Sequence, residues 1–157
     1  MNVTLSAKNS GIEGFLKGLT MRSASLQSFL NRNVYRAYQN IQRKRWITEN
    51  VSETGQWTPL SPSYAKAKKT RFKSYPGAGQ KLLIATDKLR KSVIGPGEGF
   101  RKITTPRSLI ITTSTPYAEH VDASRTFSTY SRESISELNG MIKDFVFKNI
   151  VRPHNNA

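Results

Sequence analysis

The chain has 157 residues, contains no cysteine, and carries 25 Lys and Arg against 10 Asp and Glu, a formal charge of +15. This length fits one domain with one core. The absence of cysteine excludes disulfides and thiolate metal sites, and no apolar run is long enough to predict a signal peptide or a membrane span. The basic excess indicates contact with a polyanion or with acidic protein partners. It is greater in residues 1–80, with 13 basic and 3 acidic side chains, than in residues 81–157, with 12 and 7.

The first third of the chain predicts a short strand, a short helix and one long helix. Residues 2–6 alternate polar and apolar, as a strand does, and residues 9–19 begin with a turn that can start a helix. Residues 21–47 have apolar side chains three and four positions apart, which predicts an amphipathic helix. Its apolar stripe comprises Leu26, Leu30, Val34, Ala37 and Ile41, and its opposite face carries Arg32, Arg36 and Arg43.

Residues 50–81 predict an extended, irregular stretch, because Pro59, Pro62 and Pro76 interrupt it. One or two helical turns are expected from Ser63 to Thr70. The stretch contains a basic run of Lys66, Lys68, Lys69, Arg71 and Lys73, with aromatic side chains around it. Basic and aromatic residues together favour a polyanion-binding surface. The alternative, slightly preferred on the sequence, is a solvated loop that becomes ordered against a neighbouring subunit.

The second half of the chain predicts a small sheet followed by a helix. A helix at 86–91, capped by Thr86 or Asp87, is expected to lead into a strand at 91–95. Residues 100–104 and 108–114 predict a hairpin, and residues 117–121 predict one more strand. A second amphipathic helix is expected at about 133–151, with Ser131 as its N-cap and an apolar face comprising Ile135, Leu138, Ile142, Phe145, Val146 and Ile150. The prediction is therefore a single α+β domain, with a mostly antiparallel sheet at about 91–121 packed by the two long helices.

Catalysis is not expected. His120 lies between Glu119 and Asp122, but the trio lacks the ligand spacing of a metal site. The glycines at 77 and 79 lack the full pattern of a phosphate loop. We therefore expect no catalytic residues, no metal and no cofactor.

Four segments of the chain resemble, in order, those of the phage virion-morphogenesis family, which includes tail-completion and neck proteins of tailed bacteriophages. They are Gly55-Gln56-Trp57-Thr58-Pro59-Leu60-Ser61-Pro62-Ser63-Tyr64, Lys81-Leu82-Leu83-Ile84-Ala85-Thr86-Asp87-Lys88-Leu89-Arg90-Lys91-Ser92, Thr115-Pro116-Tyr117-Ala118-Glu119-His120 and Arg125-Thr126-Phe127-Ser128. The resemblance spans about residues 40–150. Two residues depart from the pattern: Asp87 stands where the family has Gly, and Thr126 where it has Pro.

The resemblance implies a structural subunit of the virion at the head–tail junction, assembled in the host cytoplasm. Its expected partners are further copies of itself in a ring, by analogy a hexamer, together with neighbouring neck, connector and tail proteins, and no membrane. The expected subunit contacts are Trp57, Leu60, Tyr64, Arg90, Tyr117 and Phe127. Trp57 has an equal alternative as a core residue over the sheet, and Arg90 is expected to pair with a carboxylate across a subunit boundary.

The sequence leaves two other functions to consider. A free nucleic-acid-binding protein explains the charge of +15 but not the segments around Trp57 and Arg90. An enzyme would need a paired-carboxylate or metal cluster, and the ten acidic residues are scattered singly. For a subunit of the junction, we expect the basic surface to face either the path of the packaged DNA or an acidic neighbour. This surface comprises Arg32, Arg36, Arg43, Lys66, Lys68, Lys69, Arg71 and Lys73.

Overall fold

The computed structural model describes residues 2–6, 23–74, 81–83 and 86–148. The predicted helix at 9–19, Tyr75, the glycines at 77 and 79, Ile150 and the last residues lie outside this part. Within it the chain forms an α+β fold, as the sequence predicts.

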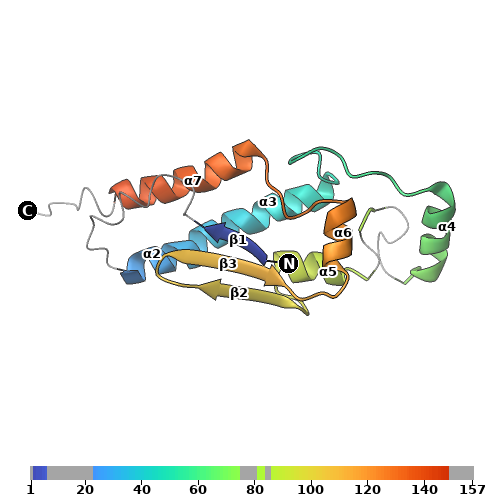
Figure 1. The fold of residues 1–157 in the computed structure, drawn as a ribbon, viewed down its shortest axis with the longest axis horizontal. Helices are drawn as coiled ribbons and strands as arrows, with labels where there is room; N and C mark the ends of the chain where they lie inside the picture. Colours follow the sequence, from blue (N-terminus) through green and yellow to red (C-terminus); the bar gives the residue numbers. More distant parts are fainter. Residues whose placement is uncertain (1, 7–22, 75–80, 84–85, 149–157) are drawn as a thin grey trace, which may run out of the picture.

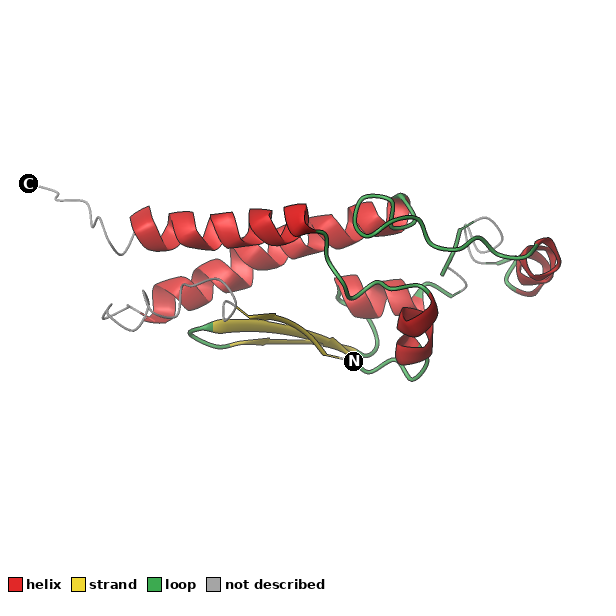
Figure 2. Ribbon diagram, turned by 45° about the horizontal axis from the view of Figure 1, so that its top comes forward, coloured by secondary structure: helices red, strands yellow, loops and turns green. Residues whose placement is uncertain are grey.

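The main body has three layers, visible in Figures 1 and 2. The outer helix is α7 (Arg132–Val146). The middle layer is one continuous rod made of α2 (Ser23–Phe29), a π-helical segment η2 (Leu30–Val34) and α3 (Tyr35–Ile47). Below it lies an antiparallel sheet of β1 (Asn2–Ser6), β3 (Ser108–Thr113) and β2 (Phe100–Thr104), in the order β1-β3-β2.

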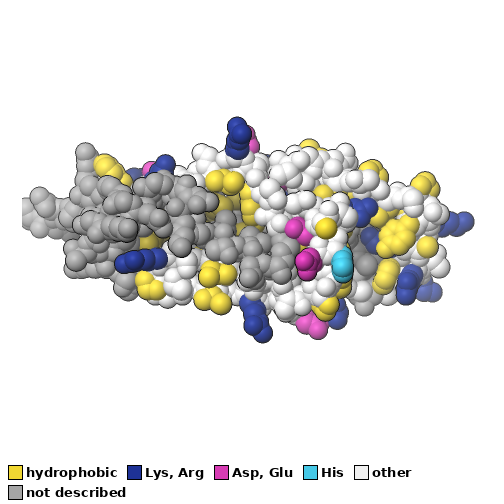
Figure 3. Space-filling model, in the orientation of Figure 1, with side chains coloured by type: hydrophobic (Ala, Val, Ile, Leu, Met, Phe, Trp, Pro, Cys, Tyr) yellow, Lys and Arg dark blue, Asp and Glu magenta, His cyan; other side chains and the backbone are white. Residues whose placement is uncertain are grey.

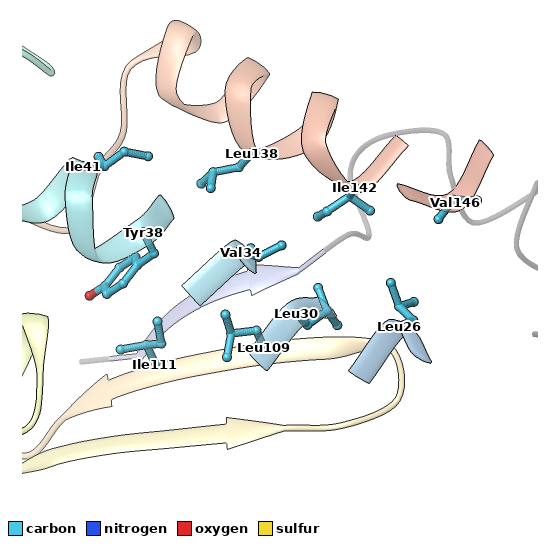
Figure 4. Packing of buried hydrophobic residues seen from close by; sticks show 10 residues of the cluster. All are labelled: Leu26, Leu30, Val34, Tyr38, Ile41, Leu109, Ile111, Leu138, Ile142 and Val146. Carbon is cyan, nitrogen blue, oxygen red and sulfur yellow. The ribbon is translucent and has the colours of Figure 1, made fainter. Parts of the chain in front are cut away.

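The middle helix fills the first core because it buries side chains on two sides. Figure 4 shows its apolar stripe between α7 above and β3 below. Leu109 and Ile111 of β3 are almost fully buried, and they alternate with half-buried neighbours, as expected for a sheet with one face on the core. The buried members of this cluster are Leu26, Leu30, Val34, Tyr38, Ile41, Leu109, Ile111, Leu138, Ile142 and Val146.

The long elements confirm the predictions from hydrophobic periodicity. The helix predicted at 21–47 runs without a break from Ser23 to Ile47, and its Arg32, Arg36 and Arg43 are exposed. Ser131 caps α7 by accepting a hydrogen bond from the backbone N–H of Ser134 at 3.1 Å. Ile135 is the exception, because 46% of its surface is exposed rather than facing the core.

Two predicted strands are helices. Residues 91–94 belong to α5 (Lys88–Ile94), and residues 117–121 lie at and within α6 (Ala118–Ser124). Both stretches are short, and a few apolar residues in a row do not distinguish a strand from a buried helix. Gly95 ends α5 with φ +74°, a conformation that other residues rarely adopt.

The stretch predicted to be irregular contains a longer helix than expected, α4 (Pro62–Arg71). Ser61 is its N-cap and accepts a hydrogen bond from the backbone N–H of Tyr64. Pro62 occupies the first turn, where its missing N–H costs nothing. In Figures 1 and 2, α4 stands apart from the main body at one end of the molecule.

No helix in the described part of the chain is long and apolar enough to cross a membrane.

Candidate assembly surface and cationic arm

The segments that carry the family resemblance meet in a second core beside the sheet. Each of the four contributes at least one buried residue to this cluster, although they are spread over some 70 positions of the chain. The buried residues are Trp46, Trp57, Leu82, Leu89, Val93, Ile94, Ala118 and Phe127. The motif residues therefore form the framework at one end of the molecule.

Two hydrogen bonds join the Trp57 segment to the segment at 125–128. The indole N–H of Trp57 donates to the carbonyl oxygen of Thr126 at 2.9 Å. In return, Nε of Arg125 donates to the carbonyl oxygen of Thr58 at 3.1 Å. Trp57 also packs edge-on against Trp46, with ring centroids 5.3 Å apart. This end of the chain is held by directional bonds as well as by apolar packing.

Asp122 organises the backbone that follows α6. One of its carboxylate oxygens accepts hydrogen bonds from the backbone N–H groups of Phe127 and Ser128, at 2.7 and 3.0 Å, and the other accepts from the Ser128 hydroxyl at 2.7 Å. Its neighbours Glu119 and His120 are exposed. No group of three or more possible metal ligands comes together within the described residues. The role that the structure gives Asp122 is to shape the loop.

A buried ion pair lies between the two cores. The Arg45 and Glu53 side chains are 0% and 2% exposed, and Nη2 of Arg45 lies 3.5 Å from a Glu53 oxygen. Arg45 donates to the carbonyl oxygens of Phe127 and Thr129, while Glu53 accepts from the Ser131 backbone and the Ser134 hydroxyl. Burial lowers the pKa of Arg45, although Tyr130 and Glu53 oppose this shift. The pair ties α3 to the loop and to the first turn of α7.

The sequence analysis did not predict this ion pair, although the position of Arg45 was a signal for it. Arg45 follows Ile41 by four residues and so continues the apolar stripe of the long helix. A charged residue on a buried stripe needs a partner, but the position of Glu53 in a loop after the helix gave no sign that it was the partner.

Asp87 and Arg90 pair within the chain at the start of α5. Two guanidinium nitrogens of Arg90 donate to the two carboxylate oxygens of Asp87, at 2.6 and 2.5 Å. This bond to Asp87 is the main reason that the pKa of Arg90 is raised. Within its own chain, Arg90 thus has a carboxylate partner three residues before it, and its pairing across a subunit boundary stays a prediction.

We call residues 61–74 the arm. A hydrogen bond fastens it to the segment that follows: Nζ of Lys68 donates to the carbonyl oxygen of Lys81 at 2.8 Å. That segment is itself held by Glu49, which accepts from the backbone N–H of Leu82 at 3.0 Å. Lys68 is only 5% exposed, and burial followed by the nearby Arg125 lowers its pKa. Lys68 therefore does not belong to the exposed basic surface on which the sequence placed it.

The other four basic residues of the run, Lys66, Lys69, Arg71 and Lys73, are exposed. None of them makes an ion pair with another described residue, although Arg71 stacks on the neighbouring Phe72 ring. Figure 3 shows Lys and Arg side chains gathered at this end of the molecule, whereas acidic side chains lie nearer the middle. The arm is thus a cationic projection.

The predicted subunit contacts fall into two groups. Trp57 and Phe127 are 3% and 0% exposed, inside the core of their own chain, and for Trp57 this is the alternative expected from the sequence. Tyr64 and Tyr117 are 56% and 42% exposed, and Leu60 is half-buried. Tyr117 borders an open pocket of about 280 Å³, whose apolar walls come from Phe72, Leu83 and Leu89. The exposed tyrosines remain predicted contacts.

Comparison of the chain with family models, with curated proteins and with solved structures finds no match.

Proposed function

We propose that this protein is a non-catalytic structural subunit of the head–tail junction of a tailed bacteriophage, where rings of such subunits join the tail to the DNA-filled head. The observation that carries the proposal is the convergence of the four family-like segments on one cluster. A shared core makes the four segments one structural unit, as a core common to a family would require. Two of them also exchange hydrogen bonds.

Two exposed tyrosines suit assembly. Tyr64 and Tyr117 are large, exposed and amphipathic, which is the composition of side chains that anchor protein interfaces. They lie on different elements, one on α4 and one beside α6. A subunit that uses two different patches makes head-to-tail contacts, and such contacts close into a ring when the rotation between copies permits it. A sixfold ring is the number that the resemblance suggests.

The test is the native mass of the purified protein, alone and after mixing with extracts that contain tailless heads or headless tails. A ring, or a monomer that assembles onto one of these parts, supports the proposal and identifies the side on which the subunit docks. A monomer that ignores both parts contradicts it.

The rival function is that of a free nucleic-acid-binding protein, and the exposed cationic arm favours it. The same experiment distinguishes the two functions. A free DNA-binding protein stays monomeric with heads and tails, and it binds duplex DNA with a steep dependence on salt.

A further inference from the structure

The distribution of acidic residues leaves the surface of the arm unneutralised. Between Glu13 and Asp87 the chain has only two acidic residues, Glu49 and Glu53. Both are used inside the molecule, Glu53 on the buried Arg45 and Glu49 on the backbone of Leu82. All acidic residues except Glu13 lie in the described part, and none of them pairs with an exposed cation of the arm.

The helical geometry of α4 separates its cations by role. At 100° per residue, Lys69 lies about 60° from Lys66 around the helix, whereas Lys68 lies about 200° from Lys66. Lys68 accordingly faces the body and bonds to Lys81, while Lys66 and Lys69 are exposed. Lys73 continues the exposed charge in the turn after the helix. We call Lys66, Lys69 and Lys73 the cationic face of the arm.

The chemistry of this face fits phosphate better than protein. Helix α4 consists of Pro-Ser-Tyr-Ala-Lys-Ala-Lys-Lys-Thr-Arg, and its one large apolar side chain, Tyr64, lies about 160° from Lys66. The core of a protein interface is enriched in aromatic residues and depleted in Lys, Ala and Ser. Among the described residues of α4, no aromatic side chain lies on the side of Lys66 and Lys69 to form a platform on which unpaired bases would stack.

We propose that the cationic face of the arm binds the phosphate backbone of duplex DNA without reading its sequence, while Tyr64 on the other side is left for protein contact. Duplex DNA carries one negative charge per roughly 1.7 Å of its axis, so several lysines on one short projection meet several phosphates at once. The arm has four exposed cations within eight residues. The exposed arginines of the long helix, Arg32, Arg36 and Arg43, are spread over twelve. The biological setting of this contact, in the channel of a junction, rests on the proposed function, but the binding itself does not.

The experiment compares two triple variants that remove the same charge. The arm variant is Lys66→Gln, Lys69→Gln and Lys73→Gln, and the control is Arg32→Gln, Arg36→Gln and Arg43→Gln. Glutamine keeps helix propensity, so both variants should fold, and circular dichroism checks this. Affinity for a short duplex of arbitrary sequence is measured on the purified protein by fluorescence anisotropy over a range of salt concentrations.

If each lysine contacts one phosphate, the slope of log affinity against log salt falls by about 2.7 in the arm variant, and affinity at physiological salt drops on the order of a hundredfold. The control variant should keep most of its slope and affinity.

Equal losses in both variants would mean that only net charge matters, and this would overturn the proposal. An unchanged arm variant would overturn it as well. An arm variant that keeps DNA affinity but no longer joins heads to tails would identify an acidic protein as the partner instead. Because no assembly is needed for the DNA measurement, failure to form rings would count against the proposed function and not against this contact.

Discussion

The indole N–H of Trp57 donates a hydrogen bond of 2.9 Å to the carbonyl oxygen of Thr126, a residue 69 positions later in the chain. The ring itself is 3% exposed and lies against Trp46. A residue with a large apolar ring and one polar atom can fill a core and fix a loop at the same time. Trp57 therefore holds the loop after α6 against the end of α3.

The first prediction tests this bond. Trp57→Phe keeps an aromatic ring but removes the N–H, so the Thr126 carbonyl loses its partner. We expect the free energy of unfolding to fall by about 1–3 kcal/mol beyond the cost of the smaller ring, measured by urea denaturation.

Trp46→Phe is the matched control. Trp46 is equally buried, but its indole nitrogen has no hydrogen-bond partner among the described residues. Its replacement removes similar apolar area and leaves no acceptor unpaired, so it should cost less. Equal losses for the two variants would show that the bond to Thr126 contributes nothing measurable.

The second prediction concerns the buried ion pair of Arg45 and Glu53. Glu53→Ala leaves the Arg45 charge buried without its carboxylate and removes the acceptor of Ser131 and Ser134. We expect a loss of about 3–5 kcal/mol in the free energy of unfolding. Glu98→Ala is the control, because its pair with Lys88 is solvent-exposed and should contribute at most about 1 kcal/mol. Similar midpoints for the two variants in urea would contradict a stabilising role for the buried pair.

The third prediction concerns the position where the family pattern has Gly and this chain has Asp87. Asp87 has φ +62°, in the left-handed region that glycine adopts most easily. Its carboxylate compensates by holding Arg90. Asp87→Ala loses the pair and keeps the strain, whereas Asp87→Gly loses the pair and relieves the strain. We expect Asp87→Gly to be more stable than Asp87→Ala by roughly 1 kcal/mol, measured by thermal or urea unfolding. An alanine variant as stable as the glycine variant would refute this account.

Among the helices, the long ones were predicted more reliably than the short ones. The long helix and α7 were predicted because their apolar residues recur over many turns, so one exposed residue such as Ile135 does not hide the pattern. Helices α5 and α6 have seven residues each, which is two turns, and their apolar residues suit a strand equally well. Their helical state depends on the second core, whose existence sequence periodicity does not show.

The candidate site was predictable in its residues but not in their roles. The basic run and the motif segments stand out in the sequence. Whether a given lysine or tryptophan faces solvent depends on what packs beside it. Lys68 and Lys69 are adjacent in the chain, yet one bonds to Lys81 and the other is exposed. The orientation of α4 relative to the body determines which of the two lysines is buried, and the sequence does not show this orientation.

The fourth prediction is a loss of stability at high pH, caused in part by the raised pKa of the Tyr130 phenol. Burial raises the pKa of Tyr130 from its ordinary value of 10.0 to about 12, and burial raises the pKa of Tyr38 in the same direction. Above about pH 10 the unfolded chain releases these protons while the folded chain keeps them. The free energy of unfolding should therefore be unaffected below pH 10 and should fall between pH 10 and about 12, by up to about 1.4 kcal/mol per pH unit for each such tyrosine.

The measurement is urea unfolding at a series of pH values for the parent and for Tyr130→Phe. Tyr130→Phe also removes the oxygen that accepts a hydrogen bond from Gln42 at 2.7 Å, so it should be less stable than the parent at neutral pH. Its slope above pH 10 should nevertheless be shallower, because one buried phenol no longer titrates. The shape of the pH profile thus separates the titration of the buried phenol from simple loss of packing, and a Tyr130→Phe profile parallel to the parent's would contradict the assignment.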